Sequence, residues 1–114
     1  MKVLLIDDDC QMMRPCFRNL NAEMFFAESE KDGLRLLQEQ GFDAILMDGH
    51  LCTERTGVDI VRDLRQSGLE TKIIMFSSKD ETNAEGIAAG ANASFNKKMI
   101  YEKGWEGNLL KLLE

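Results

Sequence analysis

Short apolar runs, each about as long as one β-strand, recur along the chain at residues 2–6, 24–27, 43–48, 72–76 and 91–96. Between and after these runs, apolar side chains recur three or four residues apart, as they do on the buried face of an α-helix. We therefore predict strands and helices in alternation from one end of the chain to the other. This alternation is typical of an α/β domain whose parallel sheet is covered by helices on both faces.

Capping residues and glycines predict where the middle helices begin and end. Ser29 and Thr56 each precede a helical pattern, where a side-chain hydroxyl can accept a hydrogen bond from the first turn. Gly41, Gly68 and Gly90 each follow a helical pattern and are expected to end it.

The first and last helices are less regular. The first is predicted to have an apolar face made of Met13, Cys16, Phe17 and Leu20. Pro15 lies within this pattern, and because proline has no N–H to donate, we expect it in the first turn of a helix that begins late. The last helix is predicted to bury one stripe of side chains, made of Tyr101, Trp105, Leu109, Leu112 and Leu113.

Polar side chains follow four of the predicted strands at the point where each strand ends. Asp7 and Asp8 follow the first strand, Asp48 ends the third, and Ser77 and Lys97 follow the fourth and fifth. Five strands fit the flavodoxin-like order 2-1-3-4-5, in which the ends of the first and third strands are neighbours. In an open parallel sheet, ligands bind at the carboxyl ends of the strands. Acids, a hydroxyl and an ammonium at those ends suit metal-assisted phosphoryl transfer to a carboxylate.

Each of these residues taken alone has a simpler explanation. An acid after a strand can cap the next helix, a serine can form a turn, and Lys97 with Lys98 can be a solvated pair. Because the groups come together at one predicted edge, we favour a functional site.

Length, charge and composition narrow the classes of function. With 114 residues, the chain is expected to form one domain, residues 1–114. Its net charge of −6 does not favour binding of nucleic acid or of an anionic membrane by this domain. No stretch approaches the ~20 apolar residues of a membrane span, and the N-terminus lacks the layout of a signal peptide. The three cysteines have no CxxC spacing, so we expect reduced thiols in a cytoplasmic protein: Cys10, Cys16 and Cys52.

These residues and their spacing resemble the receiver domain of two-component response regulators over essentially the whole chain. The acid pair of that family matches Asp7 and Asp8, and its phosphoacceptor matches Asp48. Its hydroxyl residue matches Ser77, and its lysine matches Lys97. The matches occur in the family's order, each at a predicted strand end.

The resemblance implies phosphorelay signalling rather than enzymatic turnover, with at most self-phosphorylation and self-dephosphorylation. Asp48 would accept a phosphoryl group from a histidine kinase or histidine phosphotransferase. Lys97 and Ser77 would bind the transferred oxygens, and the altered surface would then bind a downstream protein partner or output domain.

The resemblance also implies a Mg²⁺ cofactor. Asp8 and Asp48 would be direct ligands, and Asp7 would act mostly through water. The main-chain carbonyl of His50 would complete the protein ligands.

Four features depart from the family's pattern. Lys98 stands where a proline is usual, so we expect a trans peptide bond before it. Ser94 stands at the position of the family's switch aromatic. The loop up to Gly57 is one residue longer and has Cys52 in place of a proline, and Pro15 lies within the first helix.

Other functions stay open. Ser94 and Lys98 are compatible with a degenerate receiver that acts as an adaptor without phosphorylation. Lys98 also raises the question of which lysine reaches the site, and the spacing favours Lys97. A flavin carrier or a small phosphatase of the same fold class is disfavoured, because the acids after the first strand would repel a phosphate group unless a cation intervened.

Overall fold

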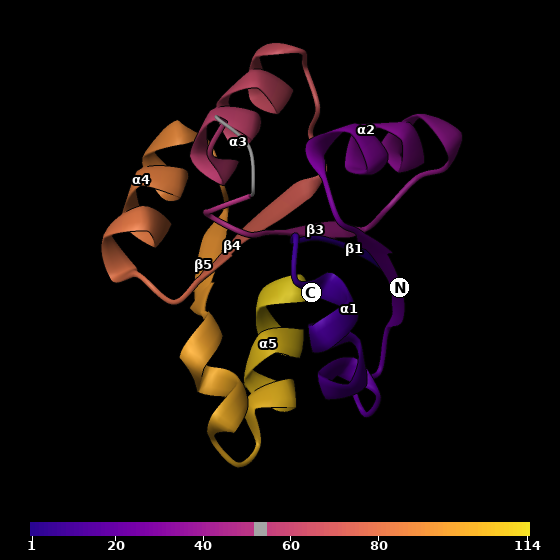
Figure 1. The fold of residues 1–114 in the computed structure, drawn as a ribbon, viewed down its shortest axis with the longest axis vertical. Helices are drawn as coiled ribbons and strands as arrows, with labels where there is room; N and C mark the ends of the chain where they lie inside the picture. Colours follow the sequence, from indigo (N-terminus) through magenta and orange to yellow (C-terminus); the bar gives the residue numbers. More distant parts are fainter. Residues whose placement is uncertain (52–54) are drawn as a thin grey trace.

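A five-stranded parallel sheet lies between two layers of helices in the computed structural model, which describes residues 1–51 and 55–114 (Figure 1). The strand order is β2-β1-β3-β4-β5, so the predicted flavodoxin-like order is confirmed. Each strand lies within two residues of its predicted bounds: β1 (Lys2–Ile6), β2 (Glu23–Ala27), β3 (Ala44–Met47), β4 (Lys72–Ser77) and β5 (Ala93–Asn96).

Helices cover both faces of the sheet. Figure 1 shows α1 and α5 on one face and α2, α3 and α4 on the other. The α-helices are α1 (Cys10–Met13), α2 (Glu30–Glu39), α3 (Gly57–Gln66), α4 (Asp80–Ala89) and α5 (Trp105–Leu113). Two short 3₁₀ segments complete the fold, η1 (Arg14–Phe17) and η2 (Lys97–Tyr101). In the described part of the chain, no helix is both long enough and apolar enough to cross a membrane.

The central strands are buried on both faces, which explains why they are continuous apolar runs. Leu5 points into the core beneath α1 and α5, with Trp105. Its neighbour Leu4 points into the other core, with Ile60 and Val61 of α3.

The caps predicted at Ser29, Thr56, Gly68 and Gly90 are present, whereas α2 ends with Gln40 as its C-cap and Gly41 follows without a positive φ. Ser29 Oγ accepts a hydrogen bond from the first turn of α2 (3.1 Å). Thr56 and Asp59 form a reciprocal capping box at the start of α3, with N···O distances of 3.2 and 3.3 Å. Gly68 and Gly90 follow α3 and α4 with φ of +93° and +126°, where a residue without Cβ is favoured.

The prediction of a late first helix is wrong. The helix begins at Cys10 and ends at Met13, and the chain continues as η1 with Pro15 in its first turn. The α-helix stops because proline cannot donate the next hydrogen bond of the helix. Phe17 and Leu20 are nevertheless buried, as their spacing indicates.

The predicted stripe on the last helix is correct for all but its first member. Tyr101 ends η2 and is 85% exposed, so it belongs neither to α5 nor to the core. Gly104 precedes α5 with a left-handed φ of +82°, which separates the two helical segments. Trp105, Leu109 and Leu113 are buried, and Leu112 is half-buried against the same core.

Candidate functional site

Three carboxylates meet at the carboxyl edge of the sheet. Asp7 and Asp8 follow β1, and Asp48 follows β3, its direct neighbour in the sheet. One carboxylate oxygen from each of the three lies within 4.8 Å of the others. Asp7 and Asp48 are buried and Asp8 is half-buried. The topology therefore brings the three predicted acids into one cluster.

Lys97, the first residue of η2, links two of these acids. Its Nζ lies 2.8 Å from Asp7 Oδ2 and 3.2 Å from Asp48 Oδ1, and 5.3 Å from the centroid of the Phe76 ring. The peptide bond before Lys98 is trans, as expected, and the Lys98 side chain is exposed. The structure thus places Lys97 against the acids.

Burial and like charge perturb the cluster. Burial, and then the charge of Asp7, raise the pKa of Asp48 to about 7, although Lys97 and the main-chain N–H of His50 oppose the shift. Burial lowers the pKa of Lys97, but its hydrogen bond to Asp7 and the charges of both acids outweigh this effect, so the net shift is upward. The contacts of Lys97 therefore offset only part of the cost of ionising the buried Asp48.

Ser77 is buried at the end of β4, beside Asn96 of β5. Its Oγ accepts a hydrogen bond from the main-chain N–H of Lys79 (3.2 Å). The buried side chain of Asn83, in α4, accepts from the Ser77 N–H (3.2 Å) and donates to the Ser77 carbonyl (3.0 Å). Asn83 was not predicted, because the small residues of this helix mark no inward face in the sequence.

The loop after β3 returns closely to its own start. The N–H of Gly57 donates to the Gly49 carbonyl (3.0 Å), and His50 forms an antiparallel bridge with Thr56. A Cβ at Gly57 would overlap the carbonyl oxygen of Asp48, so a glycine is needed there. The start of α3 therefore lies directly against the end of β3.

The structure also places Ser94 and two of the three cysteines. Ser94 is half-buried in β5, and the neighbouring Phe95 is buried in the core beneath α5. Cys10 and Cys16 carry free thiols, with the pKa of Cys10 raised by burial, and Cys52 lies outside the described residues.

The acid cluster fits a hard divalent cation. Mg²⁺ prefers oxygen ligands and keeps several waters, so a few carboxylates suffice to hold it. Burial and, after it, the charge of Asp7 raise the pKa of Asp48, and a bound cation would oppose both effects by favouring the carboxylate.

A family model of the response regulator receiver domain matches residues 3–104. The chain belongs to this family. Among the relatives of this receiver domain are the transcriptional regulatory protein CiaR of Streptococcus pneumoniae and the cell cycle transcriptional regulator CtrA of Caulobacter vibrioides. They are 26% and 28% identical to it, over 90% and 85% of this chain and 47% and 44% of their own lengths. The receiver domain thus spans about half the length of these relatives.

Solved structures share the fold of this receiver domain. The Vibrio cholerae chemotaxis protein CheY4 is 27% identical, with a TM-score of 0.74 over 98% of this chain and 94% of its own. The Francisella response regulator 1452 receiver domain is 23% identical, with a TM-score of 0.80 over 98% and 95%. Thermotoga maritima TrrA, solved with Mg²⁺ and BeF, is 17% identical, with a TM-score of 0.78 over 97% of both chains. The last two comparisons show the fold alone.

The predicted family resemblance is confirmed. Receiver domains act in phosphorelay signalling as phosphoacceptors rather than as classical enzymes, and they bind Mg²⁺ at an acidic pocket.

Proposed function

We propose that this receiver domain, residues 1–114, accepts a phosphoryl group on Asp48 from a histidine kinase or histidine phosphotransferase. The reaction depends on Mg²⁺ and switches a surface that binds a downstream protein. The observation that carries the proposal is the position of Asp48, which is buried at the end of β3. One of its carboxylate oxygens lies within 4.8 Å of an oxygen of Asp7, and its Oδ1 lies 3.2 Å from Lys97 Nζ.

The chain supplies a nucleophile and groups that bind the transferred oxygens. A carboxylate oxygen of Asp48 forms the new O–P bond as the N–P bond of the phosphohistidine breaks, and the electron pair of that bond stays on the imidazole nitrogen. Lys97, already 3.2 Å from Asp48, turns its N–H bonds toward the phosphoryl oxygens. The hydroxyl of Ser77 donates to one of these oxygens after the transfer.

Asp8, Asp48 and the main-chain carbonyl of His50 would hold Mg²⁺ directly. Asp7 would act mostly through water, since its Oδ1 already accepts from the Asp9 N–H (2.8 Å) and its Oδ2 from Lys97 (2.8 Å). When bound, Mg²⁺ supplies positive charge that keeps the acceptor ionised and offsets charge on the transferred oxygens.

Helix α4 is the element best placed to pass on the signal. Ser77 Oγ accepts from the N–H of Lys79, so a rotation of the side chain toward the phosphoryl group moves the acceptor of that bond. Asn83 ties the main chain of Ser77 to α4, so movement at the strand end is transmitted to that helix. This route needs no aromatic side chain at Ser94.

The intact mass after incubation with acetyl phosphate and Mg²⁺ tests the proposal. We expect one added phosphate in the native protein, and none without Mg²⁺ or in Asp48→Asn. Asp43→Asn is the matched control. Asp43 precedes β3, at the end of the strand away from Asp48, so its substitution should leave phosphate uptake unchanged. Equal uptake in Asp48→Asn and native protein would refute the assignment of the acceptor.

An adaptor that works without phosphorylation is the second candidate, favoured by Ser94 at the switch position and Lys98 after the lysine. Beryllofluoride with Mg²⁺ separates the two functions even when a phosphoryl group is short-lived. Shifts of the amide resonances of Ser77 and of α4 support the switch, whereas unchanged spectra together with no added mass support the adaptor.

A further inference from the structure

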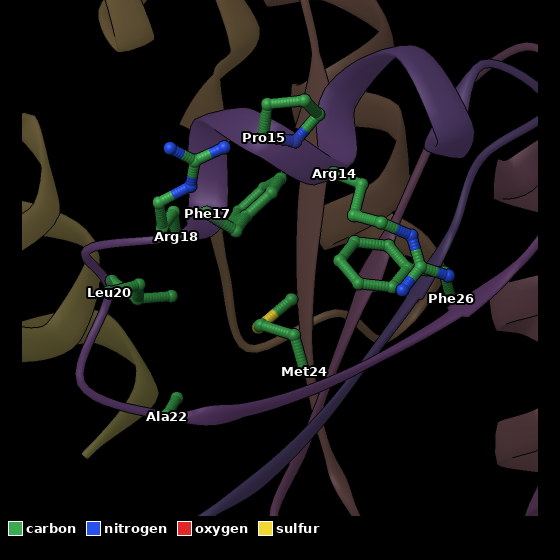
Figure 2. A pocket seen from close by; sticks show the side chains of 8 residues that line it. All are labelled: Arg14, Pro15, Phe17, Arg18, Leu20, Ala22, Met24 and Phe26. Carbon is green, nitrogen blue, oxygen red and sulfur yellow. The ribbon is translucent and has the colours of Figure 1, made fainter.

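A groove of about 370 Å³ lies between η1 and β2, formed entirely by side chains of residues 14–26 (Figure 2). Sites for small organic ligands in proteins start at roughly this volume. None of its lining side chains is among the exposed large apolar residues of the described chain. Of the apolar lining residues, Phe17 and Leu20 are buried, Met24 and Phe26 are half-buried and Pro15 is exposed, so the groove is shallow and open to solvent.

The groove exists because the first helix stops early. Helix α1 ends at Met13, and Pro15 holds the following residues in a single short 3₁₀ segment. This short cover leaves Met24 and Phe26 only half-buried on the edge strand β2. Together with Phe17, these two side chains form the apolar lining of the groove.

Two guanidinium groups flank this lining. The Arg14 guanidinium carbon lies 4.4 Å from the centroid of the Phe26 ring, which fixes its position at the rim. Arg18 lies on the other side of Phe17 (Figure 2). Within residues 1–51 and 55–114, neither arginine forms an ion pair with an acid.

The charge of the groove opposes that of the protein. Two arginines without a paired acid line this partly apolar groove, on opposite sides of Phe17, in a chain of net charge −6. Guanidinium groups bind carboxylates through paired, charge-assisted hydrogen bonds, and such bonds are stronger than neutral ones.

We propose that this groove binds a small organic carboxylate with an apolar body. The body packs against Phe17, Leu20 and Met24, and the carboxylate is held by Arg14 and Arg18. The site shares no residue with the acidic cluster, so the inference does not depend on the phosphoacceptor function.

The chain contains its own reporter of occupancy. The Phe17 ring, which lines the groove, makes an edge contact with the indole of Trp105 at a centroid distance of 5.7 Å. Trp105 is the single tryptophan of the sequence, so a ligand that displaces Phe17 changes the only indole emission.

Titration of the full chain with phenylbutanoate, beside the neutral phenylbutanol, tests the proposal. We expect a saturable change in Trp105 fluorescence and amide shifts centred on residues 14–26. Phenylbutanol has no carboxylate to pair with the arginines, so it should bind at least about tenfold more weakly than phenylbutanoate. No saturable change with phenylbutanoate, or equal affinities for acid and alcohol, would overturn the proposal.

A charge-matched pair of double variants locates the binding. Arg14→Gln with Arg18→Gln should reduce the affinity for phenylbutanoate to that for phenylbutanol and leave phenylbutanol binding unchanged. Arg35→Gln with Arg62→Gln removes the same charge from exposed arginines of α2 and α3, on the other face of the sheet, and should have no effect. Equal losses in both double variants would contradict the site.

Tighter binding of an acetylated Asp-Phe-Asp amide than of phenylbutanoate would assign the groove to a protein partner and overturn the small-molecule proposal.

Discussion

Lys97 is the residue on which the charge balance of the acidic site depends. Its ammonium contacts Asp7 and Asp48, which are both buried. Removing one partner of a buried ionic cluster is costly, because the remaining charges lose their compensation and cannot regain water. By contrast, the side chain of Lys98 is exposed and is expected to contribute little.

We therefore expect Lys97→Met to lower the free energy of unfolding by about 2 kcal/mol in metal-free buffer. The matched variant Lys98→Met should change it by less than about 0.5 kcal/mol. Urea denaturation of the three proteins in the presence of a chelator measures both changes. Similar losses in the two variants would show that the contacts of Lys97 do not stabilise the cluster.

At the scale of elements, Asn83 connects α4 to the end of β4. Its side chain satisfies both the N–H and the carbonyl of Ser77, and all of these groups are buried. A buried main-chain group that loses its partner costs more than a hydrogen bond contributes when it is formed. The strand end that carries the hydroxyl and the helix after it are therefore one mechanical unit.

Asn83→Ala should lower the free energy of unfolding by about 1–3 kcal/mol and weaken the beryllofluoride-induced shifts of α4 amides. Asn108→Ala is the matched control, since Asn108 lies exposed within α5 and gains the same helix propensity without losing a buried bond. Denaturation and amide spectra of both variants provide the test. Undiminished α4 shifts in a folded Asn83→Ala protein would rule out this route for the signal.

At the scale of the whole molecule, folding carries Asp48 into a site that resists its ionisation. The pKa of Asp48 is about 7 in the folded protein, while an unfolded chain has an aspartate pKa of ~3.9. The folded state thus binds this proton more tightly than the unfolded state. The stabilisation from this group is complete below about pH 4 and is lost as the pH rises through about 7.

We expect the native protein without metal to lose on the order of 2 kcal/mol of stability, relative to Asp48→Asn, between about pH 5 and about pH 8. Titrating groups outside the acidic cluster are common to both proteins and cancel in this difference. Urea denaturation at both pH values, with a chelator present, gives the comparison. A native protein that gained stability relative to Asp48→Asn as the pH rises would contradict the raised pKa of Asp48.

The sequence predicts some structural elements of this protein better than others. The caps at Ser29 and Thr56 were predictable, because capping depends on residues near one another in the chain. The sheet order was predictable for another reason: few parallel topologies accommodate five strands that alternate with helices. The first helix was not, because periodicity gives its buried face but not the point at which Pro15 ends α geometry. Tyr101 was misplaced for a similar reason, since Gly104 interrupts a spacing that otherwise continues.

The sequence by itself determined which chemical groups stand at the strand ends, because the order of residues along the chain decides which side chain comes after each strand. Only the tertiary structure decided which of Lys97 and Lys98 reaches the acids, that Asn83 holds Ser77, and that Arg14 and Arg18 flank an open groove. These outcomes depend on side-chain direction and burial between segments far apart in the chain. No local pattern encodes them, because they arise only when the sheet edge and its helices are packed together.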